Sequence, residues 1–532
     1  MRAGVALAAG TLAVLVAAAP ALAQKQGGTL RISHRDNPPS ASIHEEATIS
    51  TVLPFMAVFN NLVMFDPKVK ANSPDHIVPD LAESWVWSDD KTKLTFKLRQ
   101  GVKWHDGKPF TSADVKCTFD GVRGLGDEKL DIIRKSPRKI WYKNVKEITA
   151  NGEHEVTFSL ERPQPSFLSM LASGYTPVYS CHVSGRDMRS KPIGTGPFKA
   201  VEFKRNESIK VVRNPDYWKK GRPYLDAIEW RIVPNRSARL LAFGAGEFDM
   251  TFDSDVTFPL LKDVKAQRPD AVCEARPTNV SSNVLMNRDK PPFDDPKIRA
   301  AMVMALDRKA FSTILSEGHD LEGAAMLPPP AGVWGMPKDM LANLLGYATD
   351  IEKSRAEARK IMEGLGYSAD KPLRIKISTR NIPNYRDPAV ILIDQLKKIH
   401  IESELDAIDT TVWHTKVTRK DYQIGMNLTG QGVDDPDVNF YENYHSTSDR
   451  NYSGYKNPEV DKLIDQQSAE LDRDKRKKLV WEIEKKLADD VARPILNHGV
   501  ANTCLSPQLK DLVLQVNSIY NSWRFEDVWL DR

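Results

Sequence analysis

The chain has 532 residues, with 75 basic against 71 acidic side chains and a formal net charge of +4. This length exceeds what a single hydrophobic core supports, so two or three domains are expected. The sequence has no long basic run and no basic stripe interleaved with aromatic residues, so it gives a nucleic-acid partner no support.

The N-terminus has the pattern of a secretory signal peptide. Arg2 supplies a positive charge, residues 5–19 are almost entirely apolar, and Ala21-Leu22-Ala23 forms an A-x-A-like cleavage site. The run is too short to span a bilayer, and no cysteine for a lipid anchor follows the cleavage site. We therefore predict that residues 1–23 are removed and that the mature chain is exported, most simply to a bacterial periplasm.

Four cysteines, Cys117, Cys181, Cys273 and Cys504, are spread over the chain. No pair has the C-x-x-C spacing of a zinc site or a thioredoxin-like motif. An oxidising compartment would permit one or two disulfides, and four cysteines allow three full connectivities. Buried free thiols are the alternative, and the sequence leaves both open.

The first half of the mature chain is predicted to be rich in strands. Apolar and polar residues alternate with a period of two, which is typical of half-buried strands, at 94–98, 156–160, 209–211 and 228–232.

The second half alternates strands and helices, which indicates an α/β arrangement. Asp295-Pro296 and Asn457-Pro458 each combine an N-cap residue with proline at the first helical position. A strand is predicted at 373–377, and further helices at 390–399 and 474–491.

The most specific pattern lies at 77–119. It contains Pro79-Asp80-Leu81-Ala82, the Ser84-Trp85 pair, and the tight turn Gly101-Val102-Lys103-Trp104-His105-Asp106-Gly107. This order closely resembles the extracytoplasmic solute-binding proteins of family 5, which serve peptide/nickel-type ABC transporters. Further segments carry the same family pattern in the same order, at 192–199, 213–218, 287–307, 435–440 and 455–461.

The resemblance implies an α/β fold of the two-lobed, periplasmic-binding-protein-like kind (type II, cluster C), with an extra strand-rich subdomain. Lobe I would be discontinuous and comprise 24–58, 194–280 and 500–532. The inserted subdomain would comprise 59–193 and lobe II 281–499. Two crossing segments would form the hinge.

The resemblance also implies a receptor that binds a small molecule or peptide between its lobes and delivers it to an ABC permease and its ATPase at the inner membrane. A monomer without cofactor or metal is expected. The chain has no phosphate-binding G-x-x-x-x-G-K-[ST] loop, no G-x-S-x-G elbow and no H-E-x-x-H motif. A chaperone or haem-type binding protein and a secreted hydrolase remain the alternatives from other classes.

The sequence identifies the class of ligand less specifically than it identifies the family. In peptide-binding members of the family, an aspartate before the "DP" pair binds the ligand's terminal ammonium, and a tryptophan lies about three residues earlier. Here Gly432 and Thr429 stand at those positions, while Asp434 is nearby in another register. A peptide-like or other small polar organic solute is therefore expected, with an opine-like conjugate or an oligosaccharide as the alternatives.

Candidate ligand-binding residues come from loops at strand ends. Asp434 and Arg380 are the predicted charged anchors, because a desolvated ligand charge needs a partner of opposite sign. The other candidates are uncharged side chains that could donate, accept or stack, together with Gly432 and Thr429: Gln431, Asn427, Tyr175, Asn381, Tyr385, Ser40 and Ser42.

Overall fold

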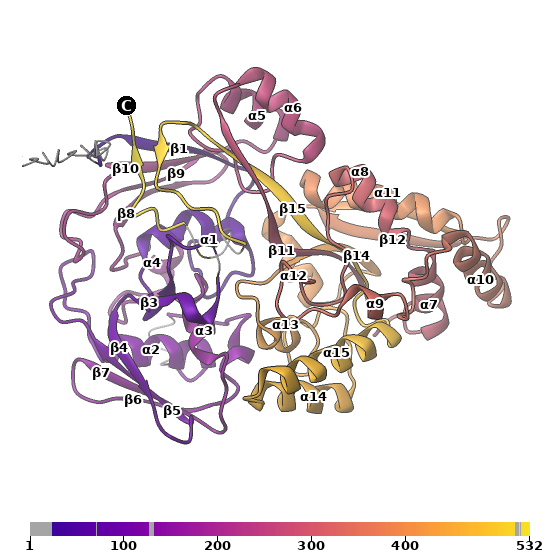
Figure 1. Cartoon of the computed structure of the whole chain (residues 1–532), viewed down its shortest axis with the longest axis horizontal. Helices are drawn as coiled ribbons and strands as arrows, with labels where there is room; N and C mark the ends of the chain where they lie inside the picture. The colour runs from indigo at the N-terminus through magenta and orange to yellow at the C-terminus, as the bar shows by residue number, and fades with distance from the viewer. Residues whose placement is uncertain (1–23, 71, 127–131, 517–520, 522) are drawn as a thin grey trace, which may run out of the picture.

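The computed structural model describes residues 24–70, 72–126, 132–516, 521 and 523–532. The predicted signal peptide, residues 1–23, lies outside the described residues. Figure 1 shows two halves side by side, one built mainly from the indigo and magenta part of the chain and one mainly from the orange part. We call residues 24–271 and 506–532 the N-terminal half and residues 287–494 the C-terminal half.

The N-terminal half contains a four-stranded sheet in the order β1-β10-β9-β8. Its strands are β1 (Thr29–His34), β8 (Phe198–Lys204), β9 (Ser208–Arg213) and β10 (Ala227–Ile232), and β1 is parallel to β10. The predicted alternation is confirmed, because Ile209, Val211, Ile228 and Trp230 are fully buried. Nearby helices are α1 (Ile49–Phe55), α5 (Arg236–Gly244) and α6 (Phe258–Gln267).

A second, antiparallel sheet falls within residues 59–193, the predicted inserted region. Its order is β4-β5-β7-β6, with β4 (Ala82–Trp87), β5 (Lys93–Leu98), β6 (Val145–Ala150) and β7 (Glu155–Leu160). The apolar side chains of β5 and β7 are buried together with those of α2 (Ser112–Arg123). A disulfide between Cys117 and Cys181 ties α2 to the segment after it.

The C-terminal half is built on a five-stranded mixed sheet in the order β13-β12-β14-β11-β15. The first three strands are β12 (Leu373–Arg380), β13 (Ile401–Ile408) and β14 (Ile424–Gly430), and β12 is parallel to both neighbours. Helices are present at all four predicted places, as α7 (Pro296–Ala305), α11 (Pro383–Lys397), α14 (Pro458–Ala469) and α15 (Arg473–Asp489), although α11 begins at Pro383 and not at the predicted position 390.

The remaining elements are short strands, short helices and the connecting helices of the C-terminal half. They are β2 (Val63–Phe65), β3 (Ile77–Pro79), β16 (Leu509–Lys510), β17 (Trp529–Leu530), η1 (Met56–Val58), η2 (Pro74–His76), η3 (Lys139–Tyr142), α3 (Phe167–Leu171), α4 (Gly185–Ser190), α8 (Arg308–Ser316), α9 (Lys338–Leu341), α10 (Ile351–Gly364), α12 (Thr410–Thr418) and α13 (Pro436–Asn443). None of the described helices is long and apolar enough to cross a bilayer.

Two long antiparallel strands, β11 (Val272–Met286) and β15 (Ile495–Leu505), run between the halves (Figure 1). Cys273 and Cys504 lie opposite each other on these strands and form a disulfide. Of the alternatives that the sequence left open, the described residues, which include all four cysteines, thus have two disulfides and no free cysteine. The predicted lobe boundaries at 280/281 and 499/500 fall inside these strands, and the division into lobes remains a prediction.

Candidate functional site

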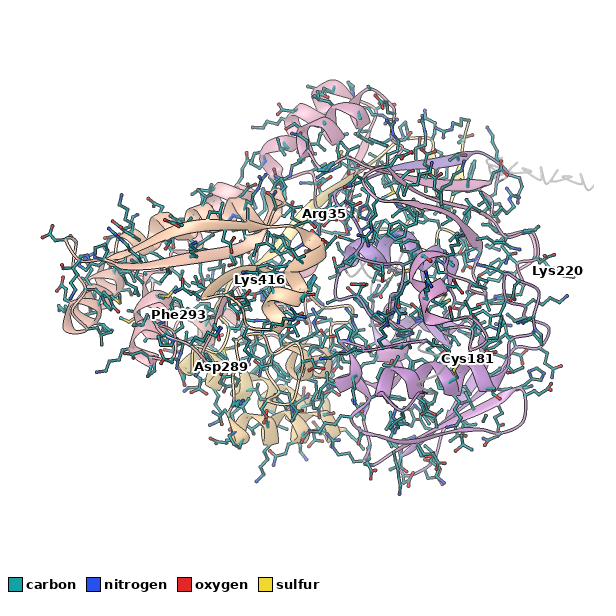
Figure 2. All side chains as sticks on the ribbon, turned by 180° about the vertical axis from the view of Figure 1, so that it is seen from behind. Arg35, Cys181, Lys220, Asp289, Phe293 and Lys416 are labelled. Carbon is teal, nitrogen blue, oxygen red and sulfur yellow. A yellow bond between two sulfur atoms is a disulfide. The ribbon has the colours of Figure 1, made fainter. Side chains whose placement is uncertain are left out.

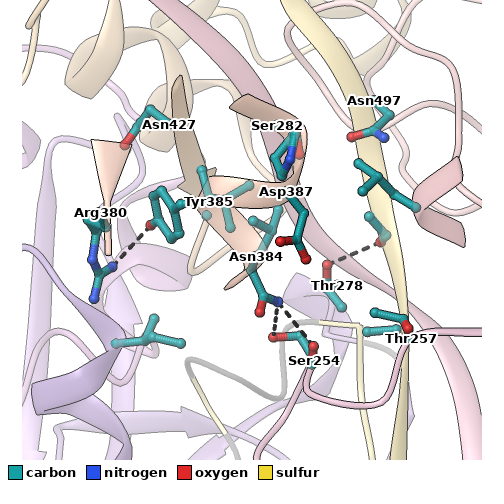
Figure 3. Close-up of a pocket in the computed structure, with 18 of the residues that line it drawn as sticks. Ser254, Thr257, Thr278, Ser282, Arg380, Asn384, Tyr385, Asp387, Asn427 and Asn497 are labelled. Atoms are coloured by element: carbon teal, nitrogen blue, oxygen red, sulfur yellow. Dashed lines mark hydrogen bonds between the residues drawn. The ribbon is translucent and has the colours of Figure 1, made fainter. Parts of the chain in front are cut away.

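A cavity of about 260 Å³ lies at the junction of the two halves, beside the crossing strands. Figure 3 shows part of its wall, and Figure 2 shows Arg35 at the junction from behind. The wall takes side chains from the N-terminal half, from β11 and β15, and from the C-terminal half. Because cleft ligands are usually bound between two domains, this cavity is the candidate site.

Hydrogen bonds join the two halves directly across the cavity. The Arg236 guanidinium donates to Asn384 Oδ1 at 2.6 Å. Asn384 Nδ2 in turn donates to the Ser254 carbonyl at 3.0 Å, as Figure 3 shows. The structure therefore has the cavity in a closed arrangement, in which both halves contribute to one wall.

A buried ion pair between Arg380 and Asp36 also joins the halves. Arg380 Nη2 lies 2.6 Å from Asp36 Oδ2, and the same guanidinium donates to the Tyr385 hydroxyl at 3.0 Å and to Thr410 Oγ1. Burial alone would raise the pKa of Asp36, but the guanidiniums of Arg380 and Arg35 hold that pKa below its ordinary value. Asp36 is therefore ionised and fixes Arg380 at the cavity wall.

A second ion-paired group adjoins the first. Arg450 Nη1 lies 2.5 Å from Glu442 Oε2, and Arg138 Nε lies 3.7 Å from the other oxygen of that carboxylate. The Arg138 guanidinium also stacks on the Tyr175 ring, at 3.2 Å from its centroid. Arg450 and Tyr175 line the cavity, while Glu442 lies behind them.

Positive charge exceeds negative charge in this wall, which we call the arginine wall. Its charged members, all buried, are the four guanidiniums of Arg35, Arg138, Arg380 and Arg450 and the two carboxylates of Asp36 and Glu442. Three of the four arginines line the cavity, whereas neither acid does. Two positive charges thus lack a counter-charge within this group, and an anionic ligand group could supply one.

His414 belongs to the same wall and contributes a neutral ring. Burial, and then the positive charges of Arg380, Arg450 and Arg138, lower the pKa of this imidazole well below its ordinary value. Both of its ring nitrogens are buried without a hydrogen-bond partner. Because a buried polar group without a partner is costly, a ligand that bonds to His414 would recover that cost.

The opposite side of the cavity includes an acidic side chain. Figure 3 shows Asn497 across the cavity from Arg380. Asn497 Nδ2 donates to Asp320 Oδ2 at 2.7 Å, and the Val500 N–H donates to Asp320 Oδ1 at 3.0 Å. Burial raises the pKa of Asp320 to about 6, so the carboxyl is mostly ionised at neutral pH.

Comparisons with known proteins identify the family. Residues 76–451 match the model of the bacterial extracellular solute-binding proteins, family 5, middle part. The chain belongs to this family. Family 5 consists of non-catalytic binding proteins that serve ABC transporters, so the predictions of a solute-binding protein and of no enzyme activity are confirmed.

Two curated relatives of this family-5 chain cover most of its length. A probable di/tripeptide-binding protein of Pseudomonas aeruginosa is 28% identical over 530 residues, covering 92% of this chain and 93% of the relative. A haem-binding protein A of Haemophilus influenzae is 26% identical over 485 residues, covering 86% of this chain and 84% of the relative.

Solved structures show the same fold. The oligopeptide-binding protein AppA of Bacillus subtilis, in complex with a nonapeptide, has a TM-score of 0.83 at 24% identity and covers 96% of this chain and 100% of its own. The binding protein AgaA of A. tumefaciens, in complex with agropinic acid, has a TM-score of 0.80 at 22% identity, over 95% and 99% of the chains. The predicted two-lobed α/β fold is therefore confirmed.

Four predicted site residues line the cavity of this family-5 protein: Arg380, Tyr385, Tyr175 and Asn427. Arg380 ends β12, and Tyr385 lies in the first turns of α11, so one strand–helix connection supplies both. Asn427 comes from β14, where its Nδ2 donates to Thr429 Oγ1 at 3.1 Å. Their meeting at one cavity supports a ligand role for these residues.

Asp434, the other predicted charged anchor, is not part of the cavity wall. Its Oδ2 accepts from the Val333 N–H at 2.9 Å, and its carbonyl accepts from Trp334 Nε1 at 3.0 Å. Burial, opposed by the Val333 hydrogen bond, raises the pKa of Asp434 to about 7. The carboxyl therefore holds the segment around Trp334.

The other predicted residues of this loop also lie outside the cavity wall. A side chain at Gly432 would place its Cβ 2.8 Å from Ser173 Oγ, so the backbone packs too closely there for a larger residue. Gln431 Nε2 donates to the Ala325 carbonyl at 3.4 Å. Thr429 Oγ1 accepts from Asn283 at 2.9 Å.

Asn381, Ser40 and Ser42 also lie outside the cavity wall. Asn381 is exposed, and its Oδ1 accepts from Arg386 at 3.2 Å. Ser40 Oγ donates to Glu46 at 2.7 Å. The hydroxyl of Ser42 is buried, 3.5 Å from that of Tyr179.

Sequence reasoning missed Arg35, Arg450, His414 and Asp320. Arg35 directly follows the strand β1, so the strand-end argument that found Arg380 could also have found it. Arg450 and Asp320 lie in loops without a motif, and His414 lies on α12 without any pattern that marks a ligand site. No group of three or more His, Cys, Asp or Glu side chains in the described part of the chain is arranged to hold a metal ion.

Proposed function

We propose that this chain is the periplasmic receptor of an ABC importer and that its ligand is a small, peptide-like organic acid. The carboxylate of the ligand would bind at the arginine wall, between Arg380 and Arg450. The relatives support this class, since one is a probable di/tripeptide-binding protein and the AgaA structure is a complex with agropinic acid.

The observation that carries this proposal is the charge excess of the arginine wall. Four buried guanidiniums share two carboxylates, and both acids lie behind the cations, away from the cavity. Buried ions without a partner are strongly unfavourable, so the closed state gains most from a ligand that brings negative charge. The planar guanidinium also matches a carboxylate in two parallel hydrogen bonds.

Ligand binding would favour the closed state over an open one. The Arg380–Asp36 pair and the Arg236–Asn384 hydrogen bond form only when the halves approach each other. A ligand carboxylate could bond to Arg380 of the C-terminal half while it contacts Arg35 of the N-terminal half. Such a ligand would bind the closed state more tightly than the open state, and this difference in affinity is what favours closure. The permease would then recognise the closed receptor and its ATPase would supply the energy.

An opine-like conjugate is the second candidate for the ligand. The cavity offers several uncharged donors and acceptors besides its arginines, notably Asn427, Thr278, Ser282 and Asn497. Such groups suit the hydroxyls of a sugar-derived acid. An uncharged oligosaccharide would leave the excess positive charge without a partner, so the cavity favours it less.

Isothermal titration calorimetry on the mature chain, freed of carried ligand by refolding, tests the proposal. The panel would contain di- to pentapeptides, amino-acid–sugar conjugates and neutral oligosaccharides. We expect binding by short peptides or conjugates, and a loss of that binding when the ligand carboxylate is converted to an amide. Binding of neutral oligosaccharides with no response to any acid would overturn the proposal.

A further inference from the structure

The cavity contains a second charged position, across from the arginine wall. Asp320 follows the helix α8, and its carboxylate lines the cavity beside Asn497 and Thr278 of the crossing strands. Figure 3 shows those two residues on the side away from Arg380. The two sides of one cavity therefore present charges of opposite sign.

Asp320 is oriented by protein groups but not neutralised by them. The Val500 N–H holds Oδ1 at 3.0 Å, and Asn497 holds Oδ2 at 2.7 Å. The Ser316 side chain also hydrogen-bonds to this carboxyl. An ionised carboxylate offers about four acceptor positions, so capacity for another donor remains. Among the described charged side chains, only the neighbouring His319 acts on the pKa of Asp320.

His319 does not offer Asp320 a counter-ion in the cavity. Its ring is stacked on Phe258, with the centroids 3.8 Å apart and the planes 11° from parallel, and it is exposed. The other acid of the cavity wall, Asp387, differs, because Arg236 lies 3.4 Å from its Oδ2. Among the described residues that line the cavity, Asp320 is thus the carboxylate without an arginine or lysine partner.

We propose that Asp320 binds a cationic group of the ligand and that the ligand is therefore a zwitterionic amino-acid derivative. This inference rests on the proposed function, which places the ligand carboxylate at the arginine wall. An ammonium group on the opposite side would donate to the free acceptor positions of Asp320 and give a desolvated carboxylate its counter-charge. The charges at the two sides would also fix the direction in which the ligand enters the cavity.

The predicted loop residues do not compete for this role. Asp434 bonds to Val333 outside the cavity wall, and the backbone around Gly432 packs against Ser173. A ligand ammonium inside the cavity therefore finds its acid at Asp320, on the strand side, rather than in the loop.

The test compares matched ligands on matched variants by isothermal titration calorimetry. The probes are alanyl-alanine and γ-glutamyl-alanine, each with its N-acetylated form, which lacks the cationic charge. The variants are Asp320→Asn, Asp320→Glu and, as a control remote from the cavity, Asp350→Asn. Asp350 caps helix α10, and asparagine caps a helix as well as aspartate does.

We expect the unmodified chain to bind at least one free-amine probe about tenfold more tightly than its acetylated form, because only the amine forms the charge pair. Asp320→Asn should reduce that ratio to about twofold or less, whereas Asp320→Glu and Asp350→Asn should keep it.

Three results would overturn the inference. The first is an unchanged ratio in Asp320→Asn, and the second is equal binding of free and acetylated probes by the unmodified chain. The third is binding of other organic acids but of no amine-bearing probe, which would leave the proposed function intact. If no organic acid bound at all, the proposed function itself would be overturned. The failure of this inference and the failure of the proposed function are therefore distinguishable.

Discussion

The arginine wall and the loop at 429–434 are both polar, but only the arginine wall presents charged side chains to the cavity. The arginine wall takes its charged residues from both halves, whereas the loop belongs to the C-terminal half. In the arginine wall, three of the four cations line the cavity and neither of their acids does. In the loop, Asp434 accepts a hydrogen bond from the Val333 N–H, and Thr429 accepts one from the Asn283 side chain. Which side chain reaches a ligand is thus decided by packing around the loop, not by the presence of a suitable charge.

The two regions also differ in how their acids are balanced. Asp36 contacts two guanidiniums, which hold its pKa below the ordinary value, whereas burial raises the pKa of Asp434 to about 7. An acid that is ionised and paired can orient a binding arginine. An acid that is partly protonated at neutral pH is a poorer partner for a ligand cation.

The largest effect is expected from breaking the pair that supports the arginine wall. Asp36→Ala would leave Arg380 and Arg35 buried without their acid, which costs about 3–5 kcal/mol for a buried pair. Part of this cost would be avoided if the two halves moved apart, so small-angle scattering should show a larger radius of gyration. Urea unfolding should show a lower free energy of unfolding.

Asp387→Ala serves as the control for this variant, because Asp387 is half-exposed and lies 3.4 Å from its arginine. It should change stability by less than about 1 kcal/mol, as exposed pairs do. Equal effects of the two variants would contradict the role given to Asp36.

The next prediction concerns ligand affinity and compares the two regions directly. Arg450→Met should weaken the binding of a carboxylate ligand by about 2–5 kcal/mol, because the ligand charge loses a buried partner. Asp434→Ala should change the same affinity by less than about 0.5 kcal/mol, because Asp434 lies outside the cavity wall. Calorimetry that gave the reverse order would restore Asp434 as the anchor and remove the arginine wall from the site.

A smaller effect is expected at His414. His414→Phe keeps a ring of similar shape but removes both nitrogens, so binding should weaken by about 1 kcal/mol, the value of one hydrogen bond. Since the pKa of His414 is well below its ordinary value, carboxylate binding should also show no histidine titration between about pH 6 and 8. A clear step in affinity in that range, absent from His414→Phe, would contradict a neutral ring.

The last prediction concerns a change in the pH dependence of stability. The pKa of Asp434 is raised to about 7 in the folded chain, so the folded state binds more protons than the unfolded one between about pH 4 and 7. Its contribution to stability therefore falls as the pH rises through that window. Urea unfolding at several pH values should show a shallower decline for Asp434→Asn than for the unmodified chain.

Asp36 should behave in the opposite way, because its pKa is lowered on folding. The stability that it contributes is present above about pH 4 and is lost as the pH falls. An identical pH profile for Asp434→Asn and the unmodified chain would show that Asp434 does not titrate between pH 4 and 7.

Much of the fold could be predicted from local patterns. The alternation at 209–211 and 228–232, and the N-cap and proline pairs at 295–296 and 457–458, each depend on neighbouring residues and are confirmed. The ordered motifs led to the family. The choice between disulfides and free thiols could not be made, because Cys273 and Cys504 meet only through pairing of strands 231 residues apart.

The site could be predicted only in part, for a related reason. Arg380 and Tyr385 follow a recognisable strand, and strand ends are where cleft residues collect. Asp320, Arg450 and His414 reach the same cavity from loops and a helix whose local sequence carries no such sign. Their position depends on how the halves pack around β11 and β15, which no short motif encodes.

Thermal unfolding of the refolded mature chain with a peptide acid and with its C-terminal amide tests the central claim most directly. The account predicts that the acid, at one hundred times its Kd, stabilises the chain by about 2.7 kcal/mol and raises its melting temperature. The amide, which lacks the carboxylate, should give little or no rise. Equal stabilisation by acid and amide would contradict the claim that the arginine wall binds the ligand through its negative charge.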